Sequence, residues 1–250
     1  MYAEHNDIHT PADSTVVWRY MSIDKYLSLL VTRELFLCRV DSFEDPWEGV
    51  WPKKQLDKFL DSKKVDEADS PGEIKRFFLE HNRKCMFVHC WHVNESESAA
   101  MWDLYSSRKS GVAIKTTVGA IKRSLDEDDD VFIGAVKYID YDDETETIPW
   151  MTMAPAFIKR KSFSHENEVR VMRRHYPLGG INDKGFRVVE FNDALPCMTL
   201  KVDLAWLISN VYFSPTMDPW LVKSLIDISK KYGIDDRVFK QSNLYDAFVL

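Results

Sequence analysis

Short apolar runs and helix-like repeats follow one another irregularly along the chain. Runs typical of strands are expected at residues 15–20, 34–39, 84–91, 111–116, 131–141, 168–173, 186–191, 197–202 and 237–240. Helical spacing is expected at residues 21–30, 96–105, 153–160 and 220–232, with a further short helix that ends at Leu125. Because these elements do not alternate as a regular β-α repeat, the pattern favours an α+β fold over a doubly wound parallel sheet.

Two segments stand apart from this pattern. Residues 1–14 are polar, and we expect a disordered N-terminus there. Residues 51–83 are highly charged, have helical spacing and are broken near Ser70-Pro71-Gly72, which indicates a solvated helical insertion at about 51–83. The remaining chain carries no repeat and no low-complexity linker. We therefore expect one α+β domain over residues 15–250.

Composition narrows the class of protein. The 250 residues are 45% hydrophobic and 29% charged, which is typical of a folded soluble protein, and the net charge of −7 gives no global reason to bind nucleic acid. We find no signal-peptide pattern and no apolar run long enough for a membrane span. The four cysteines form no C-x-x-C pair, so reduced thiols, a cytoplasmic location and no membrane association are expected.

An arginine lies between two aromatic residues on the first predicted strand, in the run Trp18-Arg19-Tyr20. A guanidinium is a forked donor that suits phosphate or carboxylate, so Arg19 is a candidate ligand-binding residue. The alternative is a salt-bridged arginine on an edge strand. Further along, the run 43–49 carries three carboxylates and Trp47, which suits either a cation or simple turn chemistry, and we favour the turn.

Two neighbouring segments combine polar and aromatic side chains. The run 90–98 contains Cys90, His92 and Glu95, but no second ligand pair with zinc spacing follows, so no metal is expected and His92 is instead a candidate cleft residue. The run 101–108 offers Trp102, Tyr105 and the Ser106-Ser107 pair, which suits stacking and ribose contacts in a nucleotide site. An amphipathic helix end with its aromatic residues in the core is an equally good interpretation.

The most specific feature is the pair Glu166 and Glu168, which enters a predicted strand. Side chains two residues apart share one face of a strand, and two carboxylates on one face repel unless a cation lies between them. Such repulsion raises the pKa of one partner, which is useful at a reaction centre. We expect Arg170 and His165 to tune the pair. A salt-bridged surface strand is the structural alternative.

The ordered motifs W-R-Y-M-S, F-E-D-P-W-E-G, C-W-H-V-N-E-S-E-S-A-A-M-W, G-V-A-I and K-S-F-S-H-E-N-E-V-R resemble an uncharacterised bacterial domain-of-unknown-function family, number 2971, from about Val17 to the C-terminus. More distantly, an arginine-bearing strand followed by the helix S-I-D-K-Y-L-S-L-L resembles the opening of the ADP-ribosyltransferase fold. Arg19, Ser106-Ser107 and Glu166-Asn167-Glu168 follow the Arg, Ser, Glu-x-Glu order of one version of those enzymes.

This second resemblance implies a fold, a substrate and a set of roles. The fold would be a mainly antiparallel mixed sheet, and NAD would be the substrate, with no metal needed. Arg19 would bind the phosphates or the nicotinamide ribose with Tyr20 and His92 nearby, and Trp102 or Tyr105 would stack in a nicotinamide pocket supported by Ser106 or Ser107. Glu168 would stabilise the oxocarbenium-like transition state, and Glu166 would orient the acceptor nucleophile.

Three functions remain open on this basis. The first is an ADP-ribosyltransferase or NAD glycohydrolase acting on an unknown acceptor as a bacterial toxin or phage-defence effector. The second is a metal-dependent nuclease effector, suggested by the basic run Lys159-Arg160-Lys161 ahead of the paired carboxylates. The third is a non-enzymatic sensor or interaction domain, which leaves room for a partner protein or a homo-oligomer.

Overall fold

The computed structural model describes residues 1–62, 77–106, 109–126, 130–143, 145–181, 187–189 and 194–246. Its centre is a mixed sheet in which the strand pairs are antiparallel except for one. The strands of this sheet follow the order β11 (Cys197–Lys201), β2 (Glu34–Arg39), β3 (Met86–Val93), β1 (Val16–Ser22), β4 (Gly111–Thr117), β12 (Asn210–Phe213) and β13 (Phe239–Gln241). The expected α+β architecture with a mainly antiparallel sheet is confirmed.

The sheet branches at β3. One edge of β3 pairs along its length with β8 (Glu168–Arg174), which also pairs with β5 (Phe132–Ala135). The opposite edge pairs with two strands at its two ends, because Val88 lies opposite Cys38 of β2 and His92 lies opposite Trp18 of β1. Among the described strands, none pairs with residues 89–91 of β3 on that edge, and a gap opens between β1 and β2.

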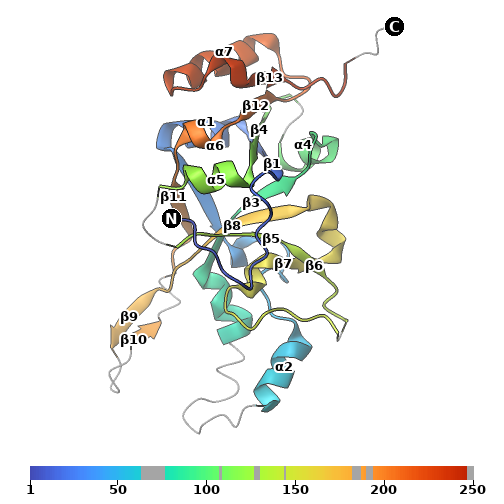
Figure 1. The fold of residues 1–250 in the computed structure, drawn as a ribbon, viewed down its shortest axis with the longest axis vertical. Helices are drawn as coiled ribbons and strands as arrows, with labels where there is room; N and C mark the ends of the chain where they lie inside the picture. Colours follow the sequence, from blue (N-terminus) through green and yellow to red (C-terminus); the bar gives the residue numbers. More distant parts are fainter. Residues whose placement is uncertain are drawn as a thin grey trace.

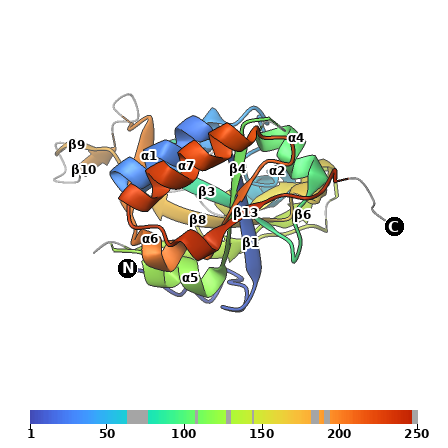
Figure 2. The same cartoon turned by 90° about the horizontal axis from the view of Figure 1, so that it is seen from above.

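Four helices pack with the strands around the largest apolar core. These are α1 (Ile23–Thr32), α5 (Val118–Ser124), α6 (Leu204–Leu207) and α7 (Pro219–Lys231), and each contributes buried side chains to that core. Figure 1 shows them at one end of the molecule, and Figure 2 shows α1 and α7 side by side. A buried hydrogen bond of 2.8 Å between the hydroxyls of Tyr26 and Ser229 joins these two helices.

The other elements lie around the branched sheet. Helix α2 (Lys53–Ser62) lies at the end of the molecule opposite α7 (Figure 1), and α4 (Ala99–Tyr105) packs on β1. Two small sheets pair β6 (Lys137–Ile139) with β7 (Ile158–Arg160) and β9 (Leu178–Ile181) with β10 (Arg187–Val189). Of the charged helical insertion expected at 51–83, α2 forms part, and residues 63–76 lie outside the described residues. No helix in the described ranges combines the length and the apolar character needed to cross a membrane.

Three local expectations differ from the structure. The single strand expected at 131–141 is two strands in different sheets, because the chain leaves β8 after Ala135 and its next strand pairs with β7. The helix expected at 153–160 is a 3-10 turn over Ala154–Phe157 followed by β7. Residues 1–14, expected to be disordered, lie along β5. The amide of Ala3 donates to the carbonyl of Val131 at 2.9 Å, and Ile8 is buried in a second core cluster.

Candidate active site

The gap in the sheet is bordered by side chains that close it in place of a strand. The guanidinium of Arg19 donates from Nη1 to the carbonyl of Cys90 at 2.7 Å, and the ring of His89 hydrogen-bonds through Nδ1 to the carbonyl of Phe36 at 2.9 Å. These bonds satisfy backbone oxygens that a regular ladder would have used. Arg19 is thus held by the fold at the point where β1 leaves β3.

A cavity of about 430 Å³ lies beside this gap. Side chains from β1, β3, α4 and the segment around β7 and β8 reach it, and the predicted site residues among them are Arg19, Tyr20, His92, Tyr105, Glu166 and Glu168. The early arginine and the late pair of carboxylates therefore line one hollow, although 147 residues separate Arg19 from Glu166 in the sequence. This convergence makes the cavity the candidate active site.

The two carboxylates reach the cavity by a route that differs from the one expected. Glu166 is the last residue of a 3-10 turn over Lys161–Glu166, and Glu168 is the first residue of β8. Between them Asn167 has a left-handed backbone with φ of 39°, a conformation that asparagine adopts more readily than most residues. The expectation that both glutamates lie on one strand is wrong, and the reversal at Asn167 brings their carboxylates together.

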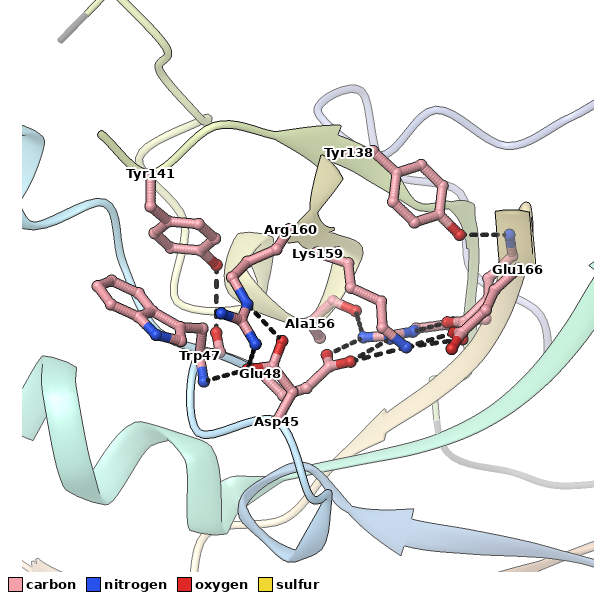
Figure 3. Close-up of polar contacts among 11 residues, drawn as sticks. Asp45, Trp47, Glu48, Tyr138, Tyr141, Ala156, Lys159, Arg160 and Glu166 are labelled. Carbon is pink, nitrogen blue, oxygen red and sulfur yellow. Dashed lines mark hydrogen bonds and ion pairs between the residues drawn. The ribbon is translucent and has the colours of Figure 1, made fainter. Parts of the chain in front are cut away.

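A buried lysine lies between the carboxylates. The Nζ atom of Lys159 is 3.2 Å from Glu168 and 3.0 Å from Glu48, and it also forms a short ion pair with Glu166. Figure 3 shows this ammonium pointing between the Glu48 and Glu166 side chains. The cation that two neighbouring carboxylates require is therefore supplied by the protein, from a residue that sequence reasoning had placed in a basic run ahead of the pair.

A second cation completes the floor of the cavity. Arg170 is fully buried and donates through Nε to Glu168 at 2.6 Å, and through Nη1 and Nη2 to Glu48 at 3.0 and 3.2 Å. Its Nη1 atom also donates to the carbonyl of Ala156 at 2.9 Å. This set of three carboxylates and two cations, which we call the floor network (Glu48, Lys159, Glu166, Glu168 and Arg170), is almost closed to water.

The floor network shifts the pKa values of the two predicted carboxylates in opposite directions. Burial raises the pKa of Glu166 to about 7, and a hydrogen bond with Glu168 adds to this increase while Lys159 opposes it. Burial also disfavours the charge of Glu168, but Arg170, the hydrogen bond from Glu166 and Lys159 together hold its pKa well below the ordinary range. At neutral pH Glu168 is an anion, whereas Glu166 exchanges a proton.

Tyr105 lies on the cavity side of Glu166. Burial, and then the charge of Glu166 and a hydrogen bond with it, raise the pKa of the Tyr105 phenol well above its usual value, so the hydroxyl stays protonated and is a donor. Tyr20 also lines the cavity, where its hydroxyl accepts from the amide of Ser98 at 2.7 Å. His92 hydrogen-bonds through Nδ1 to the carbonyl of Glu166 at 2.6 Å, which links β3 to the end of the 3-10 turn.

A second hollow of about 340 Å³ adjoins the first. The two share five lining residues, which are Arg19, Lys25, Phe36, Cys38 and Trp91. Three ring nitrogens of β3 residues that line these hollows are buried without a hydrogen-bond partner in the described part of the chain, namely His89 Nε2, Trp91 Nε1 and His92 Nε2. Unpaired buried polar atoms are costly, and here they gather beside the gap in the sheet.

Two of the described predicted residues, Trp102 and Ser106, do not line the cavity. Trp102 is fully buried, packs edge-on against Tyr20 and donates from its indole to Glu97 at 3.0 Å, so it supports the cavity wall from behind. Ser106 ends α4, and its hydroxyl donates to the carbonyl of Trp102 at 2.8 Å. Ser107 lies outside the described residues. His165, expected to tune the carboxylates, is exposed at the surface.

Sequence reasoning missed the part played by residues 43–49. Glu48 is 1% exposed and belongs to the floor network, so turn chemistry does not account for it. Two contacts visible in Figure 3 anchor the loop. Arg160 forms an ion pair with Asp45 at 2.8 Å, and the Tyr141 hydroxyl donates to the carbonyl of Trp47 at 3.2 Å. Gly49 has a left-handed φ of 69°, and a Cβ there would lie 2.4 Å from Val40.

The described residues contain no group of three or more His, Cys, Asp or Glu side chains arranged to hold a metal ion. At the one place where three carboxylates converge, the ammonium of Lys159 lies between them. This arrangement can bind a cationic or proton-exchanging group of a substrate at Glu166 and an anionic group at Arg19.

Residues 101–171 of the 250 match a family described as "Protein of unknown function (DUF2971)", the family that the sequence motifs resemble. The matched stretch runs from α4 into β8 and includes Tyr105, Lys159, Glu166, Glu168 and Arg170. Arg19 and Glu48 lie before it. Among curated proteins, none matches the chain.

Proposed function

We propose that the protein cleaves the N-glycosidic bond between nicotinamide and ribose in NAD and transfers the ADP-ribosyl group to water or to another acceptor. The observation that carries this proposal is the meeting of Arg19 with Glu166 and Glu168 around one cavity, where the pKa values of the two carboxylates are shifted in opposite directions. The order of these residues in the sequence, which resembles that of ADP-ribosyltransferases, supports it. A role as a bacterial toxin or defence effector would fit such an activity.

The chemistry needs a fixed negative charge and a proton acceptor. When the glycosidic bond breaks, nicotinamide leaves with the bonding electron pair and positive charge develops on the ribose. Glu168 remains ionised and adds to the negative potential beneath the developing charge. The deprotonated Glu166 takes the proton of the attacking water or acceptor hydroxyl, beside Tyr105 in the cavity lining.

The substrate side of the proposal rests on the cationic and aromatic lining. Arg19 forms no ion pair with a carboxylate among the described residues, so its remaining donors are available to a pyrophosphate. Flat apolar walls for the two rings of a dinucleotide come from the aromatic residues of the paired hollows, which include Tyr20, Phe36 and Trp91. Arg19 belongs to both hollows, as a pyrophosphate between two rings would require.

A metal-dependent nuclease is less well supported. Its carboxylates would have to share a divalent ion, yet Glu48, Glu166 and Glu168 already surround the ammonium of Lys159. A non-enzymatic nucleotide sensor uses the same cavity and differs only in the absence of turnover. The experiment below separates these functions.

The test incubates the purified full chain with NAD and measures the release of nicotinamide by chromatography. We expect release by the wild type and a decrease in rate of about 100- to 10,000-fold in Glu166→Gln, the range over which a general base contributes. Glu146→Gln is the matched control, because Glu146 forms surface ion pairs with Lys137 and Lys161 and does not line the cavity. Its rate should equal that of the wild type.

Each outcome has a distinct meaning. If calorimetry shows that the protein binds NAD, but no nicotinamide is released from NAD with any acceptor present, the protein is a sensor and not an enzyme. Nicotinamide release by Glu166→Gln at the wild-type rate would show that Glu166 is not the proton acceptor. Cleavage of RNA or DNA that EDTA abolishes, with no release from NAD, would favour the nuclease.

A further inference from the structure

Strands β2 and β11 bring two cysteines opposite one another. In their antiparallel register Cys38 is the direct partner of Cys197, and both thiols are free and partly exposed. Residues directly opposite in such a pair project from the same face, with Cα atoms about 4.5–5.5 Å apart. A disulfide requires a Cα separation of about 4.4–6.8 Å, so the backbone already meets this condition without a shift of either strand.

We propose that Cys38 and Cys197 form a reversible disulfide site that reacts with small disulfides such as oxidised glutathione. The thiolate of one cysteine attacks a glutathione sulfur and releases one glutathione thiolate, which takes up a proton. The second cysteine then attacks the mixed disulfide and releases the other glutathione. In total the protein loses two protons and two electrons, and one oxidised glutathione becomes two molecules of reduced glutathione.

The other two cysteines are poor competitors for this reaction. Burial raises the pKa of the Cys85 thiol to about 11, and burial likewise raises the pKa of Cys90 far above its usual value, so little thiolate forms at either. Cys90 is also displaced in register, since the direct partner of Cys38 on β3 is Val88. Diagonal neighbours in a sheet lie about 7–8 Å apart, beyond the reach of a disulfide.

The position of the pair gives the reaction a consequence for the molecule. Cys38 lines both hollows of the candidate active site, whereas Cys197 does not line either. Formation of the disulfide draws the Cys38 sulfur toward β11 and joins the edge strand of the sheet to the cavity wall. The covalent chemistry itself is independent of whether NAD is the substrate.

The experiment exposes the folded full chain to oxidised glutathione, then denatures it and alkylates the remaining thiols with iodoacetamide, and measures intact mass and unreduced peptide maps. We expect loss of two of the four alkylation sites, a peptide pair joined through Cys38 and Cys197, and full reversal by dithiothreitol. Cys90→Ser should behave as the wild type. Cys197→Ser should give no internal disulfide and a single glutathione adduct on Cys38.

Two results would overturn the proposal. One is alkylation of all four cysteines after denaturation of wild type that had been exposed to oxidant while folded, with circular dichroism confirming the fold during the exposure. The other is a linkage that contains Cys85 or Cys90. Circular dichroism shows whether Cys197→Ser folds. If it does not, Cys197→Ala or Cys38→Ala takes its place.

Discussion

The candidate active site has a floor and a wall that use charge in different ways. On the floor, Glu48, Glu168 and Arg170 have their charged atoms paired within 3.2 Å and are closed to water. On the wall, Arg19 has one backbone partner, and the ring nitrogen Nε2 of His92 has none among the described residues. Satisfied buried charges hold a structure, whereas unsatisfied donors and acceptors at a cavity indicate a ligand.

Glu166 stands between these two regions. It contacts the floor through Lys159 and the wall through Tyr105, and its pKa is raised to about 7, opposite in direction to that of Glu168. Two chemically identical side chains, two residues apart, thus receive different tasks from their surroundings. The predictions below separate the structural from the functional part of this arrangement.

The largest effect on stability is expected at the centre of the floor. Replacement of Arg170 by leucine leaves Glu48 and Glu168 without their shared cation, and removal of one partner from a buried ion pair costs about 3–5 kcal/mol of unfolding free energy. Urea denaturation followed by circular dichroism measures it. Arg237→Leu, which removes an exposed pair with Asp235, is the matched control and should leave the midpoint unchanged. Equal effects of the two substitutions would contradict the assignment of Arg170 to a buried network.

The two glutamates should differ in their contribution to stability. Glu168→Gln leaves Arg170 and Lys159 undercompensated and should cost about 3 kcal/mol at pH 7, whereas Glu166→Gln resembles the protonated side chain and should change stability by about 1 kcal/mol or less. Denaturation of both variants in parallel measures the difference. A larger loss in Glu166→Gln than in Glu168→Gln would reverse our assignment.

The same pair predicts opposite dependences of stability on pH. The folded pKa of Glu168 is lowered, so its contribution is present above the unfolded value of 4.5 and is lost as the pH falls further. The folded pKa of Glu166 is raised, so the folded state holds its proton more tightly and stability declines as the pH rises from 4.5 to about 7. Glu166→Gln should remove the decline between pH 4.5 and 7, and Glu168→Gln should weaken the acid loss.

A smaller effect is expected on the wall. Arg19→Gln removes a charged donor from the proposed pyrophosphate site, and a hydrogen bond to a charged group is worth about 1.5–3 kcal/mol, which corresponds to a 10- to 150-fold weaker affinity for ADP-ribose. Titration calorimetry measures this affinity. Arg123→Gln, on α5 over the Trp206 ring, is the control and should bind as the wild type. A loss of stability in Arg19→Gln without loss of affinity would make Arg19 a structural residue.

The rate of nicotinamide release should also respond to pH. Glu166 acts as a base only when deprotonated, so the rate should fall about tenfold for each pH unit below about 7 and level off above it. A profile that stays flat from pH 5 to pH 8 would show that no group with this pKa takes part.

Much of the frame was accessible from the sequence because it depends on local patterns. The strand that carries Arg19, helix α1, the helix before Tyr105 and the strand that begins at Glu168 all follow from periodicity and capping. Periodicity predicted one strand at residues 131–141, but this apolar pattern spans two strands that belong to different sheets. It also failed at residues 1–14, which are polar but pair with β5 through backbone hydrogen bonds that side-chain patterns do not report.

The candidate site was accessible only in part. Glu166 and Glu168 could be identified because repulsion between neighbouring carboxylates is visible in a sequence. Of their two cations, Arg170 was expected beside the pair and contacts Glu168, whereas Lys159 was not expected there, since it appeared as one member of a basic run. Glu48 contacts Arg170 although the two lie 122 positions apart in the sequence, so no local pattern could link them. The sequence signal for Glu48 was its place in a loop with Phe43 and Trp47 whose turn is fixed by Pro46 and Gly49.

The central claim is that Glu166 holds a proton near neutral pH while Glu168 does not. A carbon-13 NMR titration of the glutamate side-chain carboxyls tests it directly. The account predicts one carboxyl resonance that titrates near pH 7 and is absent from Glu166→Gln, together with one that stays ionised until the protein unfolds in acid and is absent from Glu168→Gln. Titration of every glutamate below pH 5 would contradict it.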